Sequence, residues 1–361
     1  MDGADEVAGG SRSDETGIST AASDRRRRRV GVISLGGTIA MARRTAGGVV
    51  PSLSGAELVA AVPGLEEIAE LDVVSLTQVP GAHLSFGHLR AVIAQAERAV
   101  ASGADGVVVT QGTDTIADTA FLLDLTLRST AAVVVTGAMR GPSTVGSDGA
   151  ANLLASVTVA SSPEAAGLGV LVVLNDEIHA ARFVQKTHTS NPGAFVSYPG
   201  PLGWMSEGRP LIVVTPRGRC RRLPAPTEDT PQVALVTTAI GDDGGLLRSL
   251  VGAGFAGVVV ETLGGGHVGP PVADALGELC RSVPVVVCSR VRCGELLRST
   301  YGFVGSESDL AQRGVVSGGF LDGPKARILL LALLAAGASA EEVAATFSDP
   351  FPAAAAGRRR K

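Results

Sequence analysis

The chain has 361 residues, which is enough for two domains with separate hydrophobic cores. Hydrophobic residues make up 45% of it and charged residues 18%, and the formal net charge of −4 gives no general argument for nucleic-acid binding. Because no apolar stretch is long and uninterrupted enough, no transmembrane helix is predicted.

The first 29 residues are predicted to be a disordered tail. Residues 1–24 are rich in Ser, Ala, Gly, Asp and Glu and show no apolar periodicity. Arg25–Arg29 follow and are interpreted as a solvated charge run, as is the basic tail at 351–361. Arginines before a short apolar stretch also imitate a signal peptide. That stretch contains Gly36-Gly37 and is rich in β-formers, so we favour a strand there.

Residues 30–215 alternate between apolar runs typical of strands and segments with apolar residues at helical spacing. This alternation predicts a parallel sheet covered by helices on both faces. Ser147 or Asp148 is a plausible cap for the last of the helices. The expected strands are Val30–Leu35, Asp72–Leu76, Val107–Val109, Ala132–Val135, Val170–Leu174 and Leu211–Val214, and the expected helices are Leu89–Val100, Ile116–Leu127 and Asp148–Ala160.

The pattern breaks at residues 216–231, whose prolines and charges indicate a linker. The alternation resumes over 232–350, so the predicted class is α/β with two domains. The N-terminal domain, 30–215, is the larger and has a parallel, flavodoxin-like sheet, and the C-terminal α/β domain is smaller. The strands expected in the second domain are Val233–Thr237, Gly257–Val260 and Val283–Val287, and the helices are Gly244–Gly252, Pro271–Cys280 and Pro324–Ala335.

Four cysteines, at positions 220, 280, 288 and 293, show no C-x-x-C spacing and no zinc-site pattern with histidine. A reduced, intracellular setting is the simplest interpretation. His83, His88, His179 and His188 have no metal-ligand spacing and are interpreted as surface or core residues. No metal site is predicted.

Two glycine turns carry the chemistry of the sequence. Gly36-Gly37-Thr38-Ile39-Ala40 follows one expected strand, and Gly112-Thr113-Asp114-Thr115 follows another. Reactive groups of an open parallel sheet gather at the carboxyl ends of its strands, so both threonine hydroxyls are expected to face one crevice. A threonine after a glycine turn is by itself more often a helix cap. Neither turn has the G-x-G-x-x-G or G-x-x-x-x-G-K-[ST] pattern of a nucleotide site.

A threonine hydroxyl is a weak nucleophile and needs a base, an orienting group and donors for the oxyanion. Asp114 adjoins Thr113 but is a weak base near pH 7. A lysine held near a carboxylate is a candidate for moving the proton, and the isolated Lys186 is the best choice, although its own sequence context is equally that of an exposed lysine.

Taken together, these motifs resemble those of the bacterial asparaginase/glutaminase family. The resemblance runs from Val30 to the last helix, and the two glycine–threonine signatures in this order and spacing are highly specific. Further matching segments are Gly137-Ala138-Met139-Arg140, Ser147-Asp148-Gly149, Asn175-Asp176, Lys186-Thr187, Gly200-Pro201-Leu202-Gly203, Tyr301-Gly302-Phe303 and Lys325-Ala326-Arg327.

The resemblance implies roles for the matching residues. Thr38 would be the nucleophile that attacks a side-chain amide. Thr113, Asp114 and Lys186 would relay protons and help to hold the substrate. The implied reaction hydrolyses the side-chain amide of L-asparagine, or of L-glutamine, and releases ammonia. It proceeds through a covalent acyl-enzyme and needs no metal or organic cofactor.

Substrate-binding residues are implied in the same way. Thr77 and Gln78 match a pair that grips the α-carboxylate, although the first is usually serine. Ala138 falls where a backbone carbonyl contacts the amide. Glu295 falls where a neighbouring subunit supplies a carboxylate to the α-amino group. The family resemblance therefore also implies a homotetramer with shared sites and, with the cysteine pattern, a cytoplasmic location.

The sequence departs from the family at three places. Gln111 stands where many members have histidine, and His267 replaces an asparagine near the substrate. The loop at residues 41–50 lacks the family's tyrosine and carries Arg43, Arg44 and Thr45 instead. These differences bear on efficiency and substrate choice more than on reaction type.

The sequence is therefore compatible with three functions. The first is an L-asparagine amidohydrolase, with a glutaminase-leaning amidase as a variant. The second is an amino-acid-binding protein that retains the pocket without turnover, which the missing tyrosine would suggest. The third is an amidase subunit of a transamidation complex, for which the long N-terminal tail would offer contacts with further partners.

Overall fold

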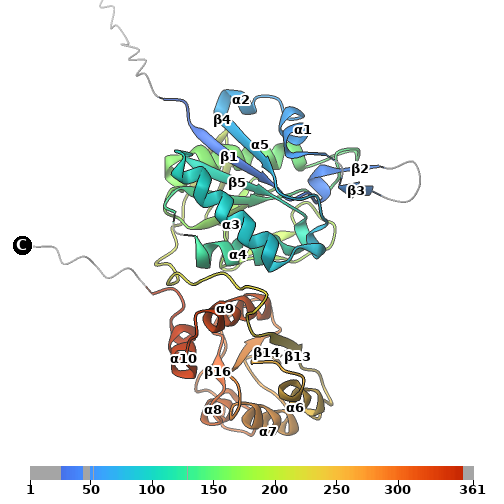
Figure 1. Cartoon of the computed structure of the whole chain (residues 1–361). Coiled ribbons are helices and arrows are strands. Elements are labelled where there is room, and N and C mark those ends of the chain that lie inside the picture. The colour runs from blue at the N-terminus through green and yellow to red at the C-terminus, as the bar shows by residue number, and fades with distance from the viewer. Residues whose placement is uncertain (1–25, 44–48, 52, 128, 353–361) are drawn as a thin grey trace, which may run out of the picture.

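The computed structural model of the protein describes residues 26–43, 49–51, 53–127 and 129–352. Residues 1–25 and 353–361 of the two predicted tails lie outside the described residues, as do Arg44 and Thr45. Figure 1 shows two α/β bodies, with a yellow connecting segment between them.

The N-terminal body is built on an eight-stranded sheet with the order β12-β11-β8-β7-β6-β5-β1-β4. The five neighbouring strands from β7 to β4 in this order are parallel. Taken along the chain, their spatial order is 2-1-3-4-5, the flavodoxin-like order. The predicted α/β class with a flavodoxin-like sheet is thus confirmed. The parallel strands are β1 (Arg29–Ser34), β4 (Glu70–Ser75), β5 (Gly106–Thr110), β6 (Ala132–Thr136) and β7 (Val170–Leu174).

The far edge of this sheet is antiparallel, a feature that the prediction of a parallel sheet did not include. β8 (Glu177–Ala180), β11 (Gly203–Ser206) and β12 (Arg209–Ile212) pair antiparallel beside β7. The cause is the Asn175-Asp176 turn, where both residues have positive φ angles of 51° and 61°. Such a turn reverses the chain at once and leaves no room for a crossover helix.

Helices cover both faces of the parallel strands (Figure 1). In β5, Val108 packs toward one face and Val107 and Val109 toward the other. This alternation explains why the strand is apolar throughout. The first face is covered by α1 (Gly55–Ala60), α2 (Leu65–Ile68) and α5 (Gly149–Ser161), and the second by α3 (Phe86–Ala101) and α4 (Ile116–Thr126).

The C-terminal body has a four-stranded parallel sheet, β13 to β16 in chain order. α6 and α7 cover one face, and α9 and α10 cover the other. The strands are β13 (Val233–Thr237), β14 (Gly257–Thr262), β15 (Val285–Ser289) and β16 (Val316–Ser317), and the helices are α6 (Gly245–Gly252), α7 (Pro270–Leu279), α8 (Glu307–Gln312), α9 (Gly323–Ala335) and α10 (Ala340–Ser348).

Besides the clusters within each body, one apolar cluster is shared between the two bodies. Phe121, Leu122 and Leu125 of α4 lie in the same cluster as Leu329 and Leu333 of α9. α4 therefore packs against its own sheet on one side and against the second domain on the other. Burial on both sides accounts for the weak amphipathic pattern of α4 and α9.

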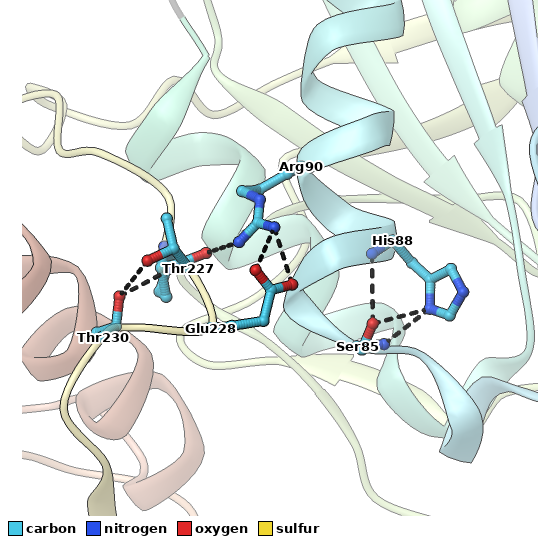
Figure 2. A network of polar contacts seen from close by, with 7 residues as sticks. Ser85, His88, Arg90, Thr227, Glu228 and Thr230 are labelled. Atoms are coloured by element: carbon cyan, nitrogen blue, oxygen red, sulfur yellow. Dashed lines mark hydrogen bonds and ion pairs between the residues drawn. The ribbon is translucent and has the colours of Figure 1, made fainter.

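The connecting segment is tied to α3 (Figure 2). Arg90 of α3 forms a bidentate ion pair with Glu228, with both Nη2–Oε distances at 2.9 Å. At the start of α3, Ser85 accepts a hydrogen bond from the backbone of His88, and His88 Nδ1 accepts one from the backbone of Ser85. His88 therefore has a structural role as part of the cap at the start of α3.

The described arginines before β1 are not simply solvated, which corrects the interpretation of the charge run. Arg26 and Arg28 each place a guanidinium nitrogen 2.9 Å from Asp105 Oδ1. The backbone N–H of Arg29 donates to the other oxygen of Asp105 at 2.9 Å. Asp105 precedes β5, so this carboxylate joins the beginnings of two adjacent strands.

Asp105→Asn is expected to lower the free energy of unfolding by about 1 kcal/mol at neutral pH, because charge-assisted hydrogen bonds are lost. Burial opposes ionisation of Asp105, but the Arg29 N–H and the charges of Arg28 and Arg26 outweigh it and lower its pKa below 3.8. The stabilisation is therefore present above pH 3.8 and disappears as the pH falls through the lower folded-state pKa. Urea unfolding from pH 7 to pH 3 would measure this, and a constant difference between the two proteins would contradict it.

Candidate functional site

Glycines allow the two threonine turns to meet. Gly37 has a φ of 81°, and a Cβ atom placed on it would lie 2.1 Å from the backbone nitrogen of Gly112. Only glycine permits this contact. The loop after β1 and the loop after β5 consequently lie backbone against backbone, which brings the Thr38 and Thr113 segments side by side.

The loops after β4 and β6 flank this junction. A Cβ atom on Gly36 would lie 3.0 Å from the carbonyl carbon of Gln78, so the Thr77-Gln78 segment abuts the Thr38 loop. On the other side, a Cβ atom on Gly137 would lie 3.3 Å from the Thr113 methyl group. Ala138 follows and is buried. Four adjacent parallel strands thus bring these predicted residues to one edge of the sheet.

Lys186 links Thr113 and Asp114. Its ammonium group donates to Thr113 Oγ1 at 2.9 Å and to Asp114 Oδ1 at 2.8 Å. Lys186 is the last residue of β9 (Val184–Lys186), which pairs with β10 (Phe195–Ser197) in a separate hairpin. Thr113 is buried, the Lys186 side chain is 19% exposed, and Asp114 is exposed at 65%. The three form a chain of polar groups from the interior to the surface.

Thr38 begins a short 3-10 turn, Thr38–Ala40, and is half-buried. Within the described residues its hydroxyl has no hydrogen-bond partner. By contrast, the Thr113 hydroxyl accepts a hydrogen bond from Lys186. A hydroxyl that accepts from an ammonium group directs its own hydrogen elsewhere, so Thr113 can donate toward a molecule bound beside Thr38.

Asp148, which directly precedes α5, and Asn152 of α5 fix the loop after β6, and the sequence did not identify either as a site residue. Asp148 accepts from the backbone of Met139 at 3.0 Å and of Arg140 at 2.8 Å. Asn152 donates to Gly137 O at 3.0 Å. Asp148 is the N-cap residue in position but makes no side-chain cap bond. Its predicted capping role is therefore replaced by support of this loop.

Gln111 supports the loop after β5. Its amide nitrogen donates to Gly112 O at 3.2 Å and to Thr115 Oγ1 at 3.1 Å, and Thr115 donates to Gly81 O at 3.0 Å. Gln111 is fully buried. Gln111, which stands where many family members have histidine, thus lies behind the site and holds the Thr113 turn.

Glu295 and His267 make their side-chain bonds within the C-terminal domain in the single chain. Glu295 is exposed and pairs with Arg298. His267 Nε2 is 3.2 Å from Glu307, and its ring contacts Tyr301 and Phe303 edge-on. No hydrogen bond or ion pair in the described part of the chain joins Glu295 or His267 to Thr38, Thr113 or Lys186. Their predicted role, which involves a neighbouring subunit, stays a prediction.

A cavity of about 360 Å³ lies between the two domains beside Asp114 and Lys186. Asp118, one turn after Asp114 on α4, also lines it, together with Glu261, Arg290 and Lys325 from the second domain. Burial raises the pKa of Asp118 to about 6, with Asp322 acting in the same direction and Lys325 and Arg327 opposing it. Asp118 has no hydrogen-bond partner among the described residues.

The described residues contain no cluster of three or more His, Cys, Asp or Glu side chains that fits a metal ion. Among those residues, no helix has the length and apolar character needed to span a bilayer.

Both domains of the chain match known family models. Residues 29–216 match the family model for the asparaginase N-terminal domain, and residues 232–347 match that for the glutaminase/asparaginase C-terminal domain. The chain is 36% identical over 312 residues to an L-asparaginase of Bacillus licheniformis, covering 85% of this chain and 96% of that protein.

Two further proteins are similar over most of their length. A probable L-asparaginase of Deinococcus radiodurans is 36% identical over 327 residues, covering 89% of this chain and 97% of that protein. The crystal structure of a probable cytoplasmic L-asparaginase from Campylobacter jejuni superposes with a TM-score of 0.80 at 29% identity, covering 89% of this chain and 99% of that one.

The glycine junction can be tested with two alanine substitutions. Gly37 and Gly167 have nearly the same φ, 81° and 77°, but a Cβ atom on Gly167 meets nothing within 4 Å. Gly167→Ala should cost about 1 kcal/mol from backbone strain alone. Gly37→Ala should cost at least about 3 kcal/mol because the clash is added. Equal losses in urea unfolding would contradict the close contact.

Asp118→Asn is expected to stabilise the protein at pH 7.5, by at most about 3 kcal/mol, which corresponds to a pKa moving from 3.8 to about 6. The Asp118 contribution is fully present below pH 3.8 and is lost as the pH rises through about 6, so the gain should vanish near pH 4. Thermal unfolding at both pH values would measure it. Asp229→Asn, at an exposed position, is the control and should show no such pH dependence.

Proposed function

The chain belongs to the asparaginase family, and we propose that it hydrolyses the side-chain amide of L-asparagine to L-aspartate and ammonia. The observation that carries the proposal is the Thr113–Lys186–Asp114 chain of hydrogen bonds beside the Thr38 turn. It supplies proton-transfer groups next to a hydroxyl that has no partner in the described residues.

Catalysis would proceed in two displacements. Thr38 Oγ attacks the amide carbon and gives its hydroxyl proton to the Thr113–Lys186 relay; the C–N bond breaks, and the amide nitrogen takes a proton from Thr113 and leaves as ammonia. Lys186 sustains this transfer because it donates to the Thr113 oxygen, while Asp114 balances its charge. Water then hydrolyses the β-aspartyl–threonine ester, which releases aspartate and restores the Thr38 hydroxyl.

Substrate positioning would come from the loops around the junction. We assign the α-carboxylate to Thr77 and Gln78, the α-amino group to Asp114, and the amide to the backbone carbonyl of Ala138. The support is their location on loops after neighbouring strands. Held in this order, the substrate would present its amide carbon to Thr38.

We further propose a homotetramer in which Glu295 and His267 complete the site of a neighbouring subunit. Tyr301 and Phe303, which pack against His267, are 46% and 49% exposed. Aromatic surface of this kind is enriched at interfaces between subunits. A cytoplasmic location is proposed from the similarity to the probable cytoplasmic L-asparaginase of Campylobacter jejuni and from the four free thiols.

Ammonia release from L-asparagine and L-glutamine tests the function. The wild type should release ammonia faster from L-asparagine. Thr38→Ala and Lys186→Met should each lower kcat by at least about 10³-fold while the circular dichroism spectrum is unchanged. Thr130→Ala, at an exposed threonine whose hydroxyl bonds to no described residue, is the control and should retain full activity.

Other outcomes would change the assignment. Activity that survives Thr38→Ala would move the nucleophile to Thr113. A wild type that binds L-aspartate in calorimetry but releases no ammonia would indicate the amino-acid-binding function. Faster release from L-glutamine would make the protein a glutaminase-type member of the family.

A further inference from the structure

Lys325 is a buried cation outside the predicted site. It lies in the first turn of α9, is 2% exposed, and has the N-cap residue Asp322 three positions before it. Its ammonium group donates to Asp322 Oδ2 at 2.7 Å and to Val184 O at 2.7 Å. A charge is tolerated in the interior only when it is paired and hydrogen-bonded, so each of these two partners matters energetically.

The second bond crosses between domains. Val184 begins β9 and Lys186 ends it. α9 belongs to the C-terminal domain, whereas β9 belongs to the N-terminal domain and delivers Lys186 to Thr113 and Asp114. A carbonyl two residues from the proposed proton-transfer lysine is therefore held by an ammonium group of the other domain.

We propose that Lys325 is a positioning residue, which fixes β9 from the C-terminal domain so that Lys186 stays within hydrogen-bond distance of Thr113 and Asp114. This proposal rests on the proposed amidohydrolase function. Among the described residues, the hydrogen bonds of Lys325 go to Asp322 and Val184, and none goes to Thr38, Thr113 or Lys186. Lys325 also lines the cavity beside Asp114 and Lys186, but the bond to Val184 O is the one that reaches β9.

Among the described residues the hairpin shares no strand pairing with the main sheet. It is held by side-chain contacts, such as the burial of Val184 and Phe195 and the Ser197–His179 hydrogen bond, together with the bond from Lys325. β9 and β10 form a separate two-stranded sheet with three residue pairs. Short two-stranded ribbons are marginally stable and depend on what packs against them. Displacement of a catalytic group by 1 Å costs about 10²-fold in rate, so a loosened hairpin would affect the chemical step strongly.

Arg327 provides a matched control on the same helix. Its guanidinium donates from Nε to Val233 O at 2.8 Å, a bond that stays within the C-terminal domain. Burial lowers the pKa of Arg327, so its guanidinium group is partly shielded from solvent. Lys325→Met removes a buried cation and Arg327→Met a half-buried one, and each removes one bond to a strand carbonyl, but only the first releases β9.

The experiment measures steady-state kinetics with L-asparagine together with hydrogen exchange of the peptide that contains residues 184–187. Lys325→Met should lower kcat about 10- to 100-fold and change KM less than about threefold, because Lys186 is displaced while the carboxylate-binding loops are unchanged. Amide exchange in 184–187 should be faster. Lys325→Arg, which can still reach a carbonyl, should recover most of kcat, and Arg327→Met should leave both readouts near those of the wild type.

Several results would overturn the proposal. These are an unchanged kcat in Lys325→Met, an equal kcat loss in Arg327→Met, or unchanged exchange in 184–187. If Lys325→Met does not fold, Asp322→Asn takes its place: asparagine still caps α9 but holds Lys325 less firmly, so a smaller kcat loss with faster exchange in 184–187 is required. A wild type without amidase activity would refute the proposed function, and hydrogen exchange would still decide the positioning role.

Discussion

The backbone contact between Gly37 and Gly112 is the constraint on which the site depends. Two strands of a parallel sheet run about 4.8 Å apart, and side chains on the loops that leave them would normally keep those loops separate. Here both loops lack a Cβ atom at the point of contact, so the turns fold over one another. The hydroxyls of Thr38 and Thr113 follow directly after the contact on each chain segment, and their separation is set by backbone rather than by flexible side chains.

The supporting groups behind the loops act on backbone atoms in the same way. Asp148 and Asn152 bond to backbone atoms of the loop after β6, and Gln111 and Thr115 bond to backbone atoms around Gly112 and Gly81. In each case a polar side chain satisfies backbone groups that would otherwise be left unpaired in a tight loop. The loops are thereby rigid where a substrate would bind, which is how pre-organisation lowers the barrier of a reaction.

Local patterns predicted the parallel core and the two glycine turns because both signals are short-range. Val107–Val109 and the turn at Gly112 occupy adjacent positions in the chain, and the structure places them in β5 and the loop that follows. The antiparallel edge was missed because it depends on the φ angles of Asn175 and Asp176, which apolar spacing does not report. Lys325 was matched only as part of a motif, because its partner Val184 is 141 positions away in sequence.

The same separation explains why the proposed proton relay draws on contacts from both domains. α4 carries Asp118 one turn beyond Asp114 and is enclosed between its own sheet and α9. α9 in turn holds Val184 through Lys325, and the strand that begins at Val184 delivers Lys186 back to Asp114. The path forms a closed loop of contacts from α4 through α9 and β9 to the start of α4. The position of Lys186 beside Asp114 therefore depends on contacts from both domains.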